Sequence, residues 1–151
     1  MEDMNTNQEG RVRRSSTDKA NQAVDQEILE NISQYGYASL EALEDRIEEL
    51  NKEWDIERVL EVNASTLALT GVLLGFAKDK RWFIVPGIVT TFLLQHGLQG
   101  WCPPLPVLRK LGFRTRKEID EERYALKILR GDFEQPSGKT APETLLKIVR
   151  K

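Results

Sequence analysis

Residues 59–100 read VLEVNASTLALTGVLLGFAKDKRWFIVPGIVTTFLLQHGLQG, and this stretch decides the fold. It holds two apolar segments of 19 residues, 59–77 and 82–100, joined by the charged tetrapeptide KDKR. At 1.5 Å per residue, a helix of this length is about 28 Å long, close to the hydrocarbon thickness of a bilayer. The pattern predicts an all-α membrane protein built on a two-helix transmembrane hairpin.

The residues at the ends of the second segment predict how the hairpin meets the membrane surface. No Asp, Glu, Lys or Arg occurs between Arg81 and Arg109. Trp82 and Trp101 stand at the two ends of this uncharged segment, as is typical of the aromatic belts at bilayer interfaces. Arg109 and Lys110 follow, and their charges suit anionic headgroups. We expect Trp82, Trp101, Arg109 and Lys110 to act as interface anchors.

Small residues recur along one face of the first segment. Ala64, Ala68, Gly71 and Gly75 fall at i, i+4, i+7 and i+11. In lipid, such a stripe lets two helix backbones approach closely and gain dispersion contact. The stripe therefore predicts the face on which the two helices pack, although small residues can also occur by chance in an apolar run.

Basic residues on the two sides of the hairpin predict its orientation. The turn has three, whereas the segments just before and after the hairpin have eight. By the positive-inside rule, both termini face the cytoplasm, although three basic residues in a short turn also resist translocation. The expected partner is the lipid bilayer, and the expected location is a membrane, with the bacterial inner membrane favoured.

The N-terminal third predicts a tail followed by a helical arm. Residues 1–21 have almost no large apolar side chains, which predicts a disordered tail. Residues 22–55 predict an amphipathic arm that is interrupted at Gly36 and resumes after Ser39 as N-cap. Two heptads are too few to establish a coiled coil, so this helix could pack on a partner, on a second copy or along the membrane surface. Its apolar residues recur at steps of three and four: Leu40, Leu43, Ile47, Leu50 and Trp54.

Residues 114–151 predict a C-terminal helical extension. Residues 115–129 read as an amphipathic helix, with Gly131 as its stop. A turn-rich linker follows, and a short last helix is expected from Pro142. All the helices that flank the hairpin are expected to be cytoplasmic.

A soluble helical bundle is the competing fold. Core helices can be this apolar if the charged helices wrap them. Residues 84–94, however, are apolar or Thr, Gly and Pro on every face, so they would require full burial in a chain of only 151 residues. The membrane interpretation is therefore favoured.

Two stretches carry a resemblance to a known family. Residues 54–62, WDIERVLEV, and residues 81–113, RWFIVPGIVTTFLLQHGLQGWCPPLPVLRKLGF, resemble the YgaP-type inner-membrane domain family. Its members share a pair of short transmembrane helices followed by a Cys-Pro motif and a Leu-Gly. The resemblance implies a domain at residues 56–113 in a membrane protein without an assigned activity. Some relatives carry a rhodanese domain, which does not fit in the rest of this chain. The matching residues here are Cys102, Pro103, Leu111 and Gly112.

The sequence shows no catalytic motif and no metal-ligand spacing, so we expect no enzyme and no cofactor. The single histidine, His96, is expected to hydrogen-bond between helices or to lie near the membrane interface. A net charge of −2 gives no general basic excess, so nucleic acid is not an expected partner. The carboxylates at residues 120–122 are interpreted as a solvated helix face.

Cys102 is the one candidate for a reactive thiol. Arg109 and Lys110 would lower its pKa if they lay close to it in space, whereas the C-terminal end of a helix would raise it. Three functions remain open. The favoured one is a non-enzymatic membrane anchor or assembly module that binds an unknown protein or a second copy. The others are a membrane-tethered sulfur or redox accessory that uses Cys102, and a soluble helical interaction module.

Overall fold

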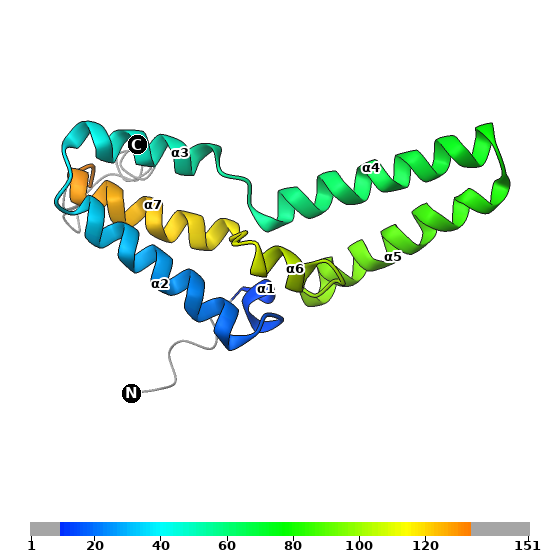
Figure 1. Cartoon of the computed structure of the whole chain (residues 1–151), viewed down its shortest axis with the longest axis horizontal. Coiled ribbons are helices and arrows are strands. Elements are labelled where there is room, and N and C mark those ends of the chain that lie inside the picture. The colour runs from blue at the N-terminus through cyan, green and yellow to red at the C-terminus, as the bar shows by residue number, and fades with distance from the viewer. Residues whose placement is uncertain (1–9, 134–151) are drawn as a thin grey trace, which may run out of the picture. The chain divides into compact units, whose positions relative to one another are not determined.

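The computed structural model describes residues 10–133, and this part of the chain is all-α (Figure 1). The chain divides into two compact units, each built from segments distant in sequence. Unit 1 contains Trp54–Lys117 and the chain up to Asp25, and unit 2 contains Gln26–Glu53 and the chain from Glu118 onward. The elements are α1 (Arg11–Arg14), α2 (Asp18–Tyr35), α3 (Leu40–Lys52), α4 (Ile56–Ala77), the 3-10 helix η1 (Lys80–Phe83), α5 (Ile84–Gln99), α6 (Leu105–Lys110) and α7 (Arg116–Arg130).

Local capping explains where the helices of the hairpin begin and end. The Asp55 carboxylate accepts a hydrogen bond from the Arg58 N–H at 2.7 Å and so caps the start of α4. After Ala77 the chain turns, and the Asp79 carboxylate accepts from the Arg81 N–H at 2.8 Å at the start of η1. Pro86 is the third residue of α5, where its missing N–H has no partner within the helix in any case.

Helices α4 and α5 lie side by side along the hairpin (Figure 1). Gly71 and Gly75 of α4 are both buried at this contact. A Cβ on Gly71 would lie 2.6 Å from Pro86 Cδ, and one on Gly75 would lie 2.9 Å from the Phe83 ring. The Phe83 ring also meets Phe76 edge-on, with centroids 5.1 Å apart. The absence of side chains at the two glycines therefore sets the distance between the helices.

The base of the hairpin is closed by a small apolar core in unit 1. Gly100 has a φ of +80°, which ends α5 and lets the chain enter the Cys-Pro segment. That segment leads into the short helix α6. Pro104 precedes α6 and Pro106 is its second residue, and a missing N–H group is tolerated at both positions. The buried residues of this core are Val12, Ile56, Leu60, Cys102 and Leu105.

The expectation of a disordered tail at residues 1–21 is wrong for its described part. Residues 11–14 form α1, and α2 already begins at Asp18. Two contacts order this segment despite its polarity. Arg13 forms an ion pair with Asp25 at 2.8 Å, and the Asn21 side chain donates to the Arg13 carbonyl at 2.9 Å. Residues 1–9 lie outside the described residues.

Unit 2 is a helical bundle in which the end of α2, α3 and α7 share one core. Gly36 follows the end of α2, and the Ser39 hydroxyl caps α3 by accepting from the Ala42 N–H at 3.3 Å. Gly131, with a φ of +87°, ends α7. The buried residues of the α3 seam thus pack within their own chain, and most of the expected arm lies in the same unit as α7. The core residues are Leu43, Ile47, Leu50, Ile119 and Leu126, with Ile32 and Tyr35 packed against them.

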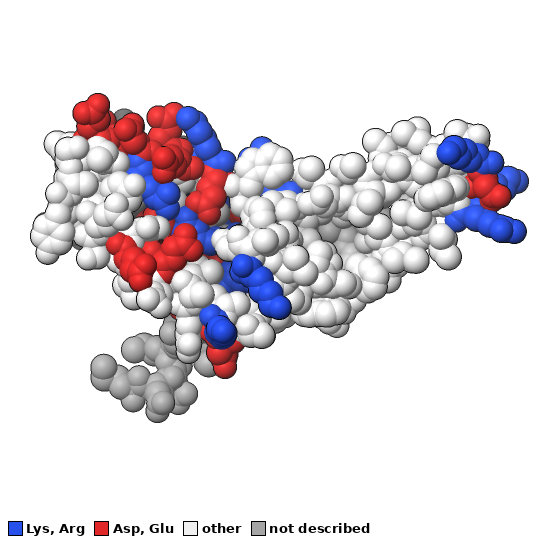
Figure 2. Space-filling model, in the orientation of Figure 1, with Lys and Arg blue, Asp and Glu red and all other residues white. Residues whose placement is uncertain are grey.

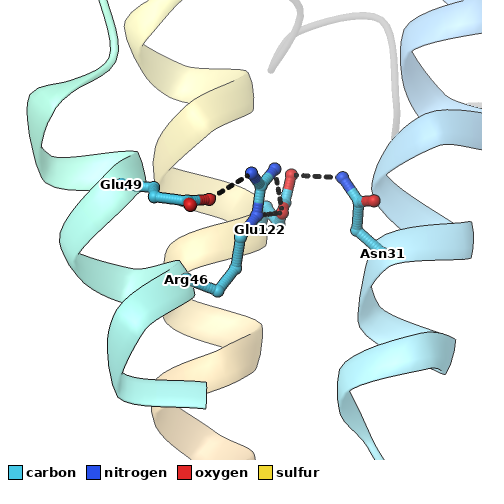
Figure 3. Close-up of polar contacts among 4 residues, drawn as sticks. All are labelled: Asn31, Arg46, Glu49 and Glu122. Carbon is cyan, nitrogen blue, oxygen red and sulfur yellow. Dashed lines mark hydrogen bonds and ion pairs between the residues drawn. The ribbon is translucent and has the colours of Figure 1, made fainter. Parts of the chain in front are cut away.

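A buried ion pair between α3 and α7, extended by a hydrogen bond from α2, lies within unit 2 (Figure 3). Glu122 is fully buried, which contradicts its interpretation as part of a solvated face, whereas Glu121 is exposed as expected. Arg46 donates to one Glu122 oxygen through Nε at 3.0 Å and Nη2 at 2.9 Å. Asn31 donates to the other oxygen at 3.3 Å, and Arg46 also pairs with the exposed Glu49 at 3.1 Å. These partners explain why a carboxylate is tolerated inside the bundle.

Among the described residues, one helical stretch is long and apolar enough to cross a membrane. It lies within Leu40–Ala77, and its most apolar part falls in α4. Of this most apolar part, 22% is buried. At 16 residues, α5 is shorter than a full span, although η1 leads directly into it. The hairpin of helices is present, and the expectation that both helices span a membrane stays a prediction.

Candidate functional site

The candidate site is the surface of the α4–α5 hairpin. On the face seen in Figure 2 the hairpin is almost without charge as far as its tip, where charged side chains gather. The turn between the two helices contains Lys78, Asp79, Lys80 and Arg81. Contiguous apolar patches of this extent on a protein surface mark an interaction with a membrane or a partner. The large apolar side chains exposed on it include Leu67, Leu69, Leu73, Phe76, Trp82, Phe83, Ile84, Ile88, Phe92, Leu94 and Leu98.

The threonines on this apolar surface have hydroxyl groups that are already hydrogen-bonded within their own helices. In each of four threonines the hydroxyl donates to the backbone carbonyl four residues earlier, at 2.6–2.7 Å. A hydroxyl satisfied by its own helix adds little polarity to the surface. The surface is therefore compatible with an environment that has no water. The four residues are Thr66, Thr70, Thr90 and Thr91.

The four expected interface anchors do not share one environment. Trp82 and Trp101 are 43% and 38% exposed at the turn and the base, and Lys110 is exposed. Arg109, in contrast, is 4% exposed, so its guanidinium is not free to bind headgroups. It donates to the Asn21 side chain at 2.9 Å and holds the start of α2 against α6. The assignment of Arg109 as an anchor was wrong because the sequence does not show that α2 covers it.

The small-residue stripe lies partly at the helix contact and partly beside a cavity. Gly71 and Gly75 pack directly against α5 and η1, while Ala64 and Ala68 are half-buried. Ala64 lines a cavity of about 400 Å³ at the base of the hairpin. The stripe thus combines close helix packing near the turn with open space near the base.

Three polar side chains line this otherwise apolar cavity: Asn63, His96 and Cys102. Asn63 donates through Nδ2 to the Val59 carbonyl at 2.8 Å. His96 is only 9% exposed, and its Nδ1 has no hydrogen-bond partner among the described residues. The sequence indicated these polar residues inside apolar segments. It did not show that α4, α5 and the Cys-Pro segment bring them to one cavity. Within residues 10–133, no cluster of His, Cys, Asp and Glu could hold a metal ion.

Cys102 is a poor nucleophile in this setting. The residue is 3% exposed within the apolar core of unit 1. Burial raises the pKa of its thiol, and a hydrogen bond from the Leu105 backbone offsets this only in part. Arg109 is engaged with Asn21 and with the Phe113 carbonyl. The lowered pKa that would accompany nearby basic side chains is therefore not found.

No family model, no curated protein and no solved structure matches this chain. The resemblance of residues 54–112 to the YgaP-type family accordingly stays a prediction. The function of the chain has to be argued from the hairpin surface and its chemistry.

Proposed function

We propose that this chain is a small, non-enzymatic membrane anchor. The α4–α5 hairpin crosses the bilayer, and unit 2 presents a helical assembly module on the cytoplasmic side. The observation that carries the proposal is the exposed apolar surface of the hairpin between its charged turn and its charged base. Moving a Leu, Ile or Phe side chain out of water contributes about 1.5–3 kcal/mol, so a surface of this size strongly favours an apolar surrounding.

The dimensions of the hairpin support the proposal. Residues 62–77 and residues 84–99 are each uncharged, and 16 helical residues are about 24 Å long. This is slightly shorter than a typical hydrocarbon core, and the flexible stems of Lys78, Lys80 and Arg81 can reach from the turn to the headgroups. The bias of basic residues toward the base favours cytoplasmic termini, in a membrane such as the bacterial inner membrane.

The two other functions have less support. A sulfur or redox accessory would need an accessible thiolate, whereas Cys102 is buried and its pKa is raised. A soluble interaction module would need a cover for the exposed residues of α4 and α5. Unit 2 remains the part of the chain that would hold a protein partner or a second copy.

Fractionation of the full chain, followed by a cysteine-labelling experiment, tests the proposal. The protein should stay in the pellet after an alkaline-carbonate wash and need detergent for release. In a Cys102→Ser background, we expect Lys80→Cys at the turn to react with a membrane-impermeant maleimide on intact cells. Lys110→Cys at the base should react only after permeabilisation.

Cys102→Ser alone is the matched control and should remain in the washed pellet. Release by carbonate would contradict insertion and favour the soluble module. Reaction of both cysteines from the same side would contradict a spanning hairpin and indicate one whose turn does not reach the opposite face of the bilayer. A phenotype lost in Cys102→Ser, with membrane retention intact, would restore the redox alternative.

A further inference from the structure

The cavity at the base of the hairpin has the properties of a ligand site. Its volume of about 400 Å³ falls within the range of small-molecule pockets, roughly 300–1,000 Å³. The walls come from α4, α5 and the Cys-Pro segment with α6, all within unit 1. We propose that the cavity binds a single-chain lipid with a neutral hydroxyl head group, such as a monoacylglycerol, whose hydroxyl group hydrogen-bonds to His96.

The apolar walls account for the chain of the ligand. Leu67 on α4 and Val89 and Phe92 on α5 line the part of the cavity that is continuous with the hairpin, and Pro103 and Leu108 line the part toward α6. The residues that line the cavity include no Asp, Glu, Lys or Arg. A phosphate, carboxylate or ammonium head group would find no opposite charge among these lining residues, which is unfavourable wherever the head group leaves water.

His96 accounts for the hydroxyl; it lines this cavity and also a second hollow that contains Arg11 and Glu57. His96 is more than nine-tenths buried, and its Nδ1 has no hydrogen-bond partner among residues 10–133. A buried polar atom left in this way is destabilising, and a ligand that pairs with it gains the corresponding free energy. A neutral imidazole has one donor nitrogen and one acceptor nitrogen. A hydroxyl both donates and accepts, so it can pair with Nδ1 in either tautomer.

The inference rests on the proposed function only for the supply of the ligand, because a bilayer is a ready source of single-chain lipids. The test uses full-length protein in phosphatidylcholine nanodiscs and a monoacylglycerol whose acyl chain carries a diazirine. After illumination, mass spectrometry maps the cross-linked peptides. We expect saturable labelling of the cavity residues that is displaced by unlabelled monooleoylglycerol.

Three variants make the test specific. His96→Leu preserves the volume of the side chain but removes the hydrogen bond. In this variant, the concentration of monooleoylglycerol that halves the labelling should rise about tenfold, as expected for the loss of one buried hydrogen bond. 1-Octadecene, which has no hydroxyl, should compete equally well for both proteins. Val89→Trp should abolish labelling by filling the cavity. Leu69→Trp, on the exposed face of α4, should leave labelling unchanged.

Several outcomes would overturn the inference. If the labelling does not saturate and spreads over the exposed face of α4 around Leu69, the probe contacts the protein only as bulk lipid. Equal competition by a short-chain phosphatidylcholine would assign the cavity to a two-chain lipid, and an unaffected His96→Leu variant would remove the polar contact. If the protein stays in buffer and does not enter nanodiscs, the proposed function fails. In that case the photo-crosslinking experiment is repeated in buffer without nanodiscs, and saturable labelling of the cavity residues still decides whether the cavity binds the probe.

Discussion

Gly71 lies where α4 and α5 come closest, and its missing side chain is a requirement of the packing. A Cβ there would lie 2.6 Å from Pro86 Cδ and 2.9 Å from Val85 Cβ. We expect Gly71→Ala to destabilise the hairpin by about 1–3 kcal/mol, the usual effect of overpacking. Thermal unfolding in detergent, followed by circular dichroism, measures the change.

Gly87→Ala is the matched control for that substitution. No heavy atom lies within 4 Å of a Cβ added at Gly87. Alanine also has the higher helix propensity, so this variant should be neutral or more stable by up to about 1 kcal/mol. Equal destabilisation by the two alanines would contradict close packing at Gly71.

At Cys102 the expected result is slow alkylation with a shifted pH dependence. Because burial raises the pKa of the thiol, the reactive thiolate appears at higher pH than in the unfolded chain. The rate of alkylation by N-ethylmaleimide at neutral pH should be lower for the folded protein than for protein in SDS. The midpoint of the pH dependence of this rate should lie at higher pH for the folded protein. Faster reaction of the folded protein at neutral pH would contradict the buried environment.

At the scale of elements, the ion pair between Arg46 and Glu122 is the polar contact that links α2, α3 and α7. Removing one partner of a buried pair leaves an uncompensated charge. We expect Glu122→Gln to lower the free energy of unfolding of unit 2 by about 2–4 kcal/mol, because Arg46 is still 19% exposed and retains some hydration. Urea unfolding followed by circular dichroism measures this change.

Two further variants separate the buried pair from its exposed neighbour. Glu49→Gln removes the partner of Arg46 that is 66% exposed, and it should change stability by less than about 1 kcal/mol. The double variant Arg46→Met/Glu122→Leu should recover most of the loss, since apolar residues of similar volume replace a buried pair well. A double variant as unstable as Glu122→Gln would argue against this account.

The exposed face of α4 offers a test of the surroundings of the hairpin. Leu69 is 60% exposed near the middle of the helix. In a bilayer, Leu69→Arg should oppose insertion by about 3 kcal/mol and reduce the fraction retained after carbonate washing. Leu69→Met is the conservative control and should be retained. On a soluble surface, the arginine would change stability by less than about 0.5 kcal/mol and would leave the fractionation unaltered.

For the molecule as a whole, the two compact units should respond separately to substitution. Gly71 lies in unit 1, and Glu122 lies in unit 2. In hydrogen–deuterium exchange, Glu122→Gln should speed exchange in α3 and α7 while the protection of α4 and α5 stays unchanged, and Gly71→Ala should do the reverse. Equal loss of protection throughout either variant would mean that the chain unfolds as one cooperative unit.

The parts of this fold that could be predicted from sequence are those set by neighbouring residues. Ser39 and Gly131 mark a helix start and a helix end through local rules, and the two apolar segments correspond to α4 and α5. The burial of Glu122 could not be predicted, because its partner Arg46 lies 76 residues away. The ordering of α1 and the cavity at His96 depend on equally distant segments.

The contact between the N-terminal segment and the base of the hairpin has a consequence for biosynthesis. Gly100 lies so close to Arg11 that an added Cβ would be 2.5 Å from its backbone, and Val12 shares a core with Leu105. Leu105 follows Val12 by 93 residues, so a ribosome needs about 5 to 20 s to complete that core. During this interval the first helices emerge before their packing partners exist. The order of synthesis therefore leaves the N-terminal segment without its packing partners, and accessible to chaperones, while the hairpin is still being made.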